Sequence, residues 1–217
     1  DGYTDITIFD KKDTHYWLHF EFETPEAEEG FNYYLNATTG INGWNASNPQ
    51  GMLYLNGKMV QGLDLNHTDF LLQPSTKYDA YIYLYTGTLT DFFKFKVFVS
   101  KLHNKTNKLY YDILTAFEAL KVLNANTSEY VTILKALEMT ANLIDFRAIH
   151  SEDYYNSIDK AEEYIENEFY NKICSTKDKP VVHLIGHTHI DVEWLWHRRQ
   201  TREKIQRSFA TAKALMD

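Results

Sequence analysis

The period of the hydrophobic pattern changes near residue 105, and this change limits the folds open to the chain. Before residue 105, segments such as Tyr16–Phe22 alternate in side-chain character, with apolar residues at every second position, which indicates half-buried strands. Asn, Gly and Pro turns separate these segments, as in antiparallel sheets. After residue 105, apolar residues recur at helical spacing. We therefore predict a multi-domain chain that starts with an antiparallel β-sandwich or jelly-roll-like domain over residues 1–104.

Particular strands of this domain can be predicted from local signals. Asn56-Gly57 separates two apolar segments and predicts a hairpin with a type I′ turn. Trp17 alternates with Leu18, and we expect it in the core. Trp44 lies in a turn-like stretch, and whether it is buried or exposed is left open. The other predicted strands cover Tyr3–Phe9, Tyr78–Tyr85 and the segment in which Phe93, Phe95, Val97 and Val99 share a face.

Residues 105–175 are predicted to form a helical linker region. Thr127 or Ser128 is expected to cap the second helix, and a third helix is expected from about Glu152 to Tyr170. The inward stripes are Leu109, Ile113, Ala116, Phe117 and Leu120, then Leu134, Leu137, Ala141 and Ile144, then Ile158, Ala161, Ile165 and Phe169.

Residues 180–217 are predicted to start an α/β catalytic domain. The apolar run at 181–185 predicts a strand that continues to 191, and the next helix is expected at 201–216, with Thr201 as its cap and no capping box. Its apolar stripe is Ile205, Phe209, Ala212 and Met216. One strand cannot bury itself, so either more chain follows or this segment packs on the preceding helices.

Composition and charge narrow the function classes. Lys and Arg number 22 and Asp and Glu 30, which gives a net charge of −8 and argues against nucleic-acid binding. No apolar stretch is long enough to span a membrane, and no signal peptide is visible in a chain that begins with Asp1. Cys174 is the only cysteine, so neither a disulfide framework nor a cysteine zinc cluster is expected. We predict a cytoplasmic protein and attribute its five Asn-x-Ser/Thr sequons to chance.

The predicted strand at 181–191 carries the clearest candidates for a functional site. Side chains alternate along a strand, so His187, His189 and Asp191 are expected to point to one side. Imidazole and carboxylate groups that converge at a strand end are typical of part of a metal site. Trp194 and Trp196 follow, and an indole face suits a sugar ring or an apolar ligand.

This segment resembles the start of the catalytic domain of glycoside hydrolase family 38, the retaining α-mannosidases. The likeness rests on His187–Asp191 and Val192–Trp196, and it continues through Thr201, Arg202, Lys204, Arg207–Thr211 and Leu215-Met216. The upstream order of a β-rich domain followed by helices also resembles the bacterial and cytosolic members. The resemblance implies an enzyme that removes terminal α-mannose from oligosaccharides.

By that resemblance, His189 and Asp191 are ligands of a divalent metal, most often zinc. His187 and Trp194 are then substrate-binding residues. The family's nucleophile and general acid lie far downstream, so no catalytic residue is expected within residues 1–217, and this chain alone should hydrolyse nothing. Glu193 is not expected to act as an acid, because family members often carry a small residue there.

Two alternatives from other classes remain open. An amidohydrolase-type enzyme takes two metal ligands from a His-x-His on its first barrel strand, which would use His187 and His189 together. A non-catalytic role would make residues 1–100 a carbohydrate-binding or oligomerisation module, and homo-oligomer formation stays open. The basic cluster Arg198, Arg199, Arg202 and Arg207 departs from the family pattern, and we expect it to be a solvated helix face.

Overall fold

The computed structural model describes residues 7–9, 11–39, 49–87, 93–175, 181–187, 189–194 and 196–216. The predicted strand residues 3–6, Trp44 and most of the predicted linker at 175–180 therefore lie outside the described residues. The chain divides into two compact units, one made of residues 1–101 and 185–217 and the other of residues 102–184.

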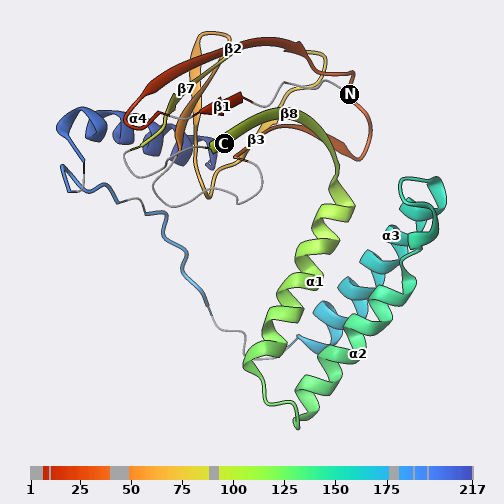
Figure 1. Ribbon diagram of the computed structural model, residues 1–217. Coiled ribbons are helices and arrows are strands. Elements are labelled where there is room, and N and C mark those ends of the chain that lie inside the picture. Colours follow the sequence, from red (N-terminus) through yellow and green to blue (C-terminus); the bar gives the residue numbers. More distant parts are fainter. Residues whose placement is uncertain are drawn as a thin grey trace. The chain divides into compact units, whose positions relative to one another are not determined.

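The first unit contains two four-stranded antiparallel sheets (Figure 1). One sheet has the order β1-β8-β3-β6, with bounds Thr7–Phe9, Phe93–His103, Phe31–Thr38 and Asp69–Leu72. The other has the order β2-β7-β4-β5, with bounds His15–Glu23, Lys77–Tyr85, Gln50–Leu55 and Lys58–Leu63. The predicted β-rich N-terminal part followed by helices is thus confirmed.

A single hydrophobic core joins the two sheets. One sheet contributes Leu35 of β3 and Phe95 of β8, and the other contributes Leu53 of β4 and Ile82 of β7. Each of these side chains is almost completely buried, because alternate residues of each strand turn to the same side.

The predicted hairpin at Asn56-Gly57 is present between β4 and β5. Both residues have positive φ, 51° at Asn56 and 77° at Gly57, as a type I′ turn requires. The Asn56 side chain also accepts a hydrogen bond from the Asp79 backbone N–H at 2.8 Å and donates to the Lys77 carbonyl at 3.2 Å. This short turn therefore fixes the hairpin against the neighbouring β7.

Trp17 is not a core residue, which contradicts the prediction. Its side chain is 59% exposed on β2, while its neighbours Tyr16 and Leu18 pack against the core. Alternation predicted two faces correctly but did not say which side of β2 each residue occupies. The aromatic residue lies on the outer face.

The second unit consists of helices. It contains α1 (Asn104–Val122), α2 (Ser128–Leu143) and α3 (Glu152–Tyr164), a short η1 turn (Phe146–Ala148), and η2 (Ile165–Ile173), a π-helical continuation of α3. Thr127 caps α2 as predicted, since its side chain accepts a hydrogen bond from the Tyr130 N–H. None of the described helices is both long enough and apolar enough to cross a membrane.

The predicted inward stripes are largely confirmed. Buried stripe residues are Leu109, Ala116 and Leu120 of α1 and Ile158, Ala161, Ile165 and Phe169 of α3 and η2. Phe117, Leu134 and Ala141 are exposed, which contradicts the prediction. Each lies at the edge of its stripe, where a three-helix contact does not reach.

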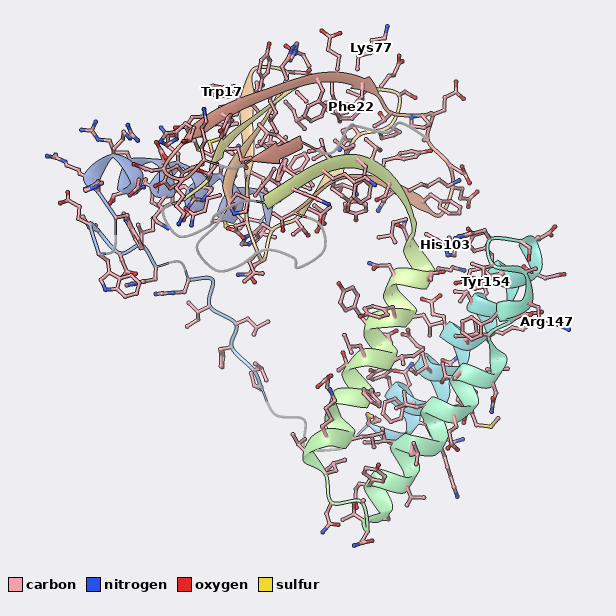
Figure 2. All side chains as sticks on the ribbon, in the orientation of Figure 1. Trp17, Phe22, Lys77, His103, Arg147 and Tyr154 are labelled. Atoms are coloured by element: carbon pink, nitrogen blue, oxygen red, sulfur yellow. The ribbon has the colours of Figure 1, made fainter. Side chains whose placement is uncertain are left out.

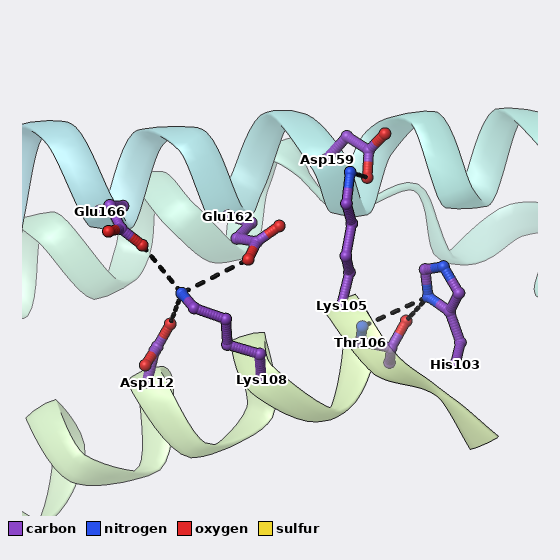
Figure 3. Close-up of polar contacts among 8 residues, drawn as sticks. All are labelled: His103, Lys105, Thr106, Lys108, Asp112, Asp159, Glu162 and Glu166. Atoms are coloured by element: carbon purple, nitrogen blue, oxygen red, sulfur yellow. Dashed lines mark hydrogen bonds and ion pairs between the residues drawn. The ribbon is translucent and has the colours of Figure 1, made fainter. Parts of the chain in front are cut away.

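Ion pairs bind α1 to the α3–η2 segment (Figure 3). The Lys108 ammonium lies 2.9 Å from Asp112, 2.9 Å from Glu166 and 3.4 Å from Glu162. Hydrogen bonds to these carboxylates raise the pKa of Lys108. Lys105 forms a further pair with Asp159 at 2.8 Å.

Replacing Lys108 with Met is expected to lower the free energy of unfolding of the helical unit by about 1 kcal/mol at pH 7, because half-exposed pairs contribute about 0.2–1 kcal/mol each. The variant also leaves the carboxylates facing one another. A raised folded-state pKa means that this contribution is complete below the unfolded pKa of lysine and is lost as the pH rises through the raised pKa of the folded state. Urea unfolding followed by circular dichroism measures the loss. The exposed Lys135 of α2 supplies the control, and an equal loss in Lys135→Met would contradict the interpretation.

Candidate functional site

The strand predicted over residues 181–191 is absent from the described part of this segment. Residues 181–187 and 189–191 have neither strand nor helix structure, and Val181, Leu184 and Ile185 are 79%, 91% and 86% exposed. A strand requires a neighbouring strand for its hydrogen bonds. No strand of the described residues pairs with this segment, so the apolar run stays exposed.

The helix of this segment is present, but it begins earlier and packs differently from the prediction. α4 spans Arg198–Ala214. Its capping box joins His197 and Gln200, where the His197 N–H donates to Gln200 Oε1 at 2.9 Å. Thr201 is therefore not the cap. Its hydroxyl accepts from the Glu193 N–H at 3.1 Å and from Trp196 Nε1 at 3.2 Å, which ties the turn before the helix to α4.

α4 packs on β5 through polar side chains rather than through its apolar stripe. Ile205, Phe209 and Met216 are 36%, 58% and 79% exposed, whereas Gln200, Thr201, Arg207 and Thr211 are buried. This arrangement contradicts the predicted inward stripe.

Gly62 of β5 explains the polar contact. Its N–H donates to Thr211 Oγ1 at 3.0 Å, and a Cβ at this position would lie 2.2 Å from Arg207 Cγ. The glycine thus leaves the space that the Arg207 side chain fills. Arg207 also donates to Gln50 Oε1 at 2.7 Å. Burial lowers the pKa of its guanidinium.

The basic cluster is only in part the solvated face that was predicted. Arg198 and Arg202 are exposed, as expected. Arg199 donates to His15 Nε2 at 2.7 Å, and Arg207 is buried against the sheet. Two of the four arginines therefore hold α4 in place.

The motif residues line a pocket of about 460 Å³ between this segment, α4 and the loop after β5 (the motif pocket). His189 Nε2 lies 2.7 Å from Asp191 Oδ1, and both side chains are well exposed to solvent. His187 lines the same pocket. The three predicted residues are thus brought together although the strand is missing.

The two tryptophans of the motif differ in their surroundings. Trp196 lines the motif pocket, and the Lys204 ammonium lies 4.0 Å from the centre of its ring. Burial lowers the pKa of Lys204 to about 8, with a further contribution from Arg207. Trp194 is 66% exposed, makes an edge contact with Trp196 at 5.8 Å, and is not among the residues that line the pocket.

Sequence reasoning missed Asp64 and His67, which also line the motif pocket. The Asp64 carboxylate accepts from the backbone N–H groups of Asn66 and His67, and it lies 2.8 Å from His67 Nδ1. An Asp two residues before Asn66 is a local turn signal. Nothing in the sequence connects it with a motif more than a hundred residues later.

The donor chemistry of His189 and Asp191 fits a zinc ion. Zinc binds imidazole nitrogen and carboxylate oxygen at about 2.0–2.2 Å, so neighbouring ligand atoms lie about 3.3 Å apart in a tetrahedral site. The observed 2.7 Å is a hydrogen-bond distance that needs only a small opening. These residues supply two ligands, while catalytic zinc sites take three from protein.

The described residues contain one group of three potential ligands with atoms within 4.8 Å of one another. It comprises His19, Glu21 and Asp79, on β2 and β7. His19 Nε2 lies 2.7 Å from Asp79 Oδ1, and the side chains are about half exposed. The predicted motif does not form such a group.

Comparison with known families covers the motif segment alone. Residues 179–217 match the model described as Glycosyl hydrolases family 38 N-terminal domain. This match includes His187, His189, Asp191 and the whole of α4. It supports a glycoside hydrolase. No curated protein sequence matches the chain.

Proposed function

We propose that residues 1–217 form the N-terminal part of a metal-dependent retaining α-mannosidase that removes terminal α-mannose from oligosaccharides. The observation that carries the proposal is the close pairing of His189 and Asp191 inside a segment that matches a family 38 model. The bacterial or cytosolic type of the family and a cytoplasmic location belong to the same proposal.

In this proposal, His189 and Asp191 hold a zinc ion, and the ion supplies binding of sugar hydroxyls and stabilises a distorted ring. The pairing favours these two residues as ligands over His187 and His189 together, the set that an amidohydrolase would use. His187 lines the same pocket and is proposed to contact the substrate.

The proposed work of the chain's own residues is to bind and orient mannose. The exposed Trp194 indole offers a face for the sugar ring, and its edge contact with Trp196 limits its movement. Lys204 in turn holds the Trp196 ring. The nucleophile and the general acid, which a retaining enzyme needs about 5–5.5 Å apart, are proposed to lie outside residues 1–217.

The exposed apolar side chains of the segment support the proposal that it belongs to a larger α/β domain. Val181, Leu184 and Ile185, together with Phe209 of α4, are uncovered among the described residues. A parallel strand and its helix are normally covered on both faces. We propose that further strands of the catalytic domain cover them.

Hydrolysis of an aryl α-mannoside by the full-length protein tests this function. We expect activity that a chelator removes and added zinc restores, and no activity in residues 1–217 alone. A folded, metal-loaded full-length protein that leaves the α-mannoside intact would exclude the mannosidase. Turnover by residues 1–217 alone would instead contradict the placement of the nucleophile and the general acid outside these residues. Hydrolysis of an amide substrate instead would support the amidohydrolase alternative.

A further inference from the structure

The outer face of β2, β7 and β4 carries a cluster of aromatic side chains around Trp17 (the Trp17 patch; Trp17 is labelled in Figure 2). The ring of Trp17 lies 5.0 Å from that of Tyr83, 5.5 Å from Tyr54 and 6.4 Å from Tyr81, measured between centroids. Strand register accounts for the cluster, because Trp17 pairs with Tyr83 and Tyr54 pairs with Tyr81. An exposed tryptophan grouped with three partly exposed tyrosines marks a candidate binding surface.

The tyrosine rings hold the Trp17 indole in a defined orientation. Its plane is tilted by 55° to Tyr83 and 77° to Tyr81, both on the neighbouring β7, and by 49° to Tyr54 on β4. Because β2 is an edge strand, these tyrosines border the indole on its inner side. A side chain already fixed by its neighbours loses little entropy when a ligand binds. The indole is therefore a preorganised apolar platform on a rigid sheet.

Hydrogen-bonding groups border the aromatic rings. His19 stacks on Tyr81 with centroids 4.3 Å apart and lies 2.7 Å from the Asp79 carboxylate. Glu21 lies opposite Asp79 in the strand register, and the three polar groups come within 4.8 Å of one another. Carboxylates accept strong hydrogen bonds from hydroxyl groups.

This combination selects the chemistry of the ligand. An apolar platform beside carboxylate acceptors suits a molecule with one C–H face and hydroxyls at its edge, which describes a pyranose ring. The acidic border of Glu21 and Asp79 disfavours anionic ligands such as phosphates and nucleic acids. We infer that the Trp17 patch binds a neutral sugar unit of an oligosaccharide, at a site separate from the motif pocket. The inference does not depend on the proposed mannosidase activity.

Ligand-detected NMR and calorimetry with the intact chain test this inference. The probes are α-linked mannotriose, maltotriose and cellotriose, which are neutral and differ in linkage. We expect saturation transfer to the ring C–H protons of at least one of them, and a loss of affinity of about two- to tenfold in Trp17→Ala, since aromatic contacts contribute about 0.5–1.5 kcal/mol and about 1.4 kcal/mol is tenfold. Trp17→Phe should retain part of the affinity.

Two matched variants separate the patch from other exposed aromatic residues. Phe146→Ala removes a side chain of the η1 turn that is 62% exposed, and Tyr110→Ala removes an α1 side chain that is 58% exposed. Both should bind the trisaccharide as the unaltered chain does. Equal binding by folded Trp17→Ala, loss of binding only in one of the two control variants, or absence of binding to all three probes would overturn the inference. So would self-association that Trp17→Ala abolishes while no sugar binds.

Discussion

Alanine at His189 or at Asp191 is expected to lower the proposed zinc affinity of the full-length protein by more than about 100-fold and to remove the proposed α-mannosidase activity. Loss of a residue that only supports a ligand already costs about 10–100-fold in affinity or activity, and loss of a ligand should exceed this. His189 and Asp191 lie 2.7 Å apart in the motif pocket, so each would lose its partner at the same ion. Elemental analysis after dialysis, and competition with a chromogenic chelator, measure zinc independently of turnover.

His187 and His183 provide the controls for this prediction. His187→Ala is expected to keep the zinc, because His187 is proposed to contact the sugar and not the ion. His183 is an exposed histidine of the same segment that does not line the pocket, so His183→Ala should keep both zinc and activity. If His187→Ala lost zinc as completely as His189→Ala, the amidohydrolase set of ligands would replace the one proposed. Retention of zinc by His189→Ala would refute both sets.

Local signals in the sequence predicted the parts of the fold that depend on neighbouring residues. The Asn56-Gly57 turn and the Thr127 cap each depend on a few adjacent residues, and both are present. The stripe of Ile158, Ala161 and Ile165 was also correct, because an amphipathic helix has one face that can be buried. These features need no knowledge of the rest of the chain.

Features that depend on distant partners could not be predicted in the same way. The run before His187 reads as a strand, but a strand forms only where another strand accepts its hydrogen bonds. α4 buries Arg207 and Thr211 rather than Phe209 because Gly62, far away in the sequence, leaves room for them. Periodicity identifies a face, but the surface that covers it is decided by tertiary structure.

The same limit applies to the candidate site. His187, His189 and Asp191 were predicted together from their spacing, and they line one pocket for a different reason, since the turn before α4 is tied to Thr201. The three residues thus share a pocket without the strand on which their grouping was based, and their roles stay predictions. Asp64 joins the pocket from the loop after β5, and no spacing rule links these segments.

Replacing Leu35 with Ala is expected to lower the free energy of unfolding of the β unit by about 2–5 kcal/mol, the usual cost of a leucine-sized cavity. Leu35 lies on β3, is fully buried and belongs to the core that joins the two sheets. The same change at Leu71 of the adjacent β6 should cost less than about 1 kcal/mol, because that side chain is 47% exposed.

Tryptophan fluorescence during urea unfolding measures the free energy of unfolding of the β unit in the Leu35→Ala and Leu71→Ala variants. All four tryptophans lie within residues 1–101 and 185–217, so their emission reports the unit that contains Leu35. The two variants remove the same atoms from neighbouring strands of one sheet, and therefore the difference between them isolates burial from β propensity. Equal losses in the two variants would mean that the two sheets do not share the core described here. A large difference would confirm that contact between the sheets, rather than hydrogen bonding within one sheet, stabilises the platform that carries Trp17.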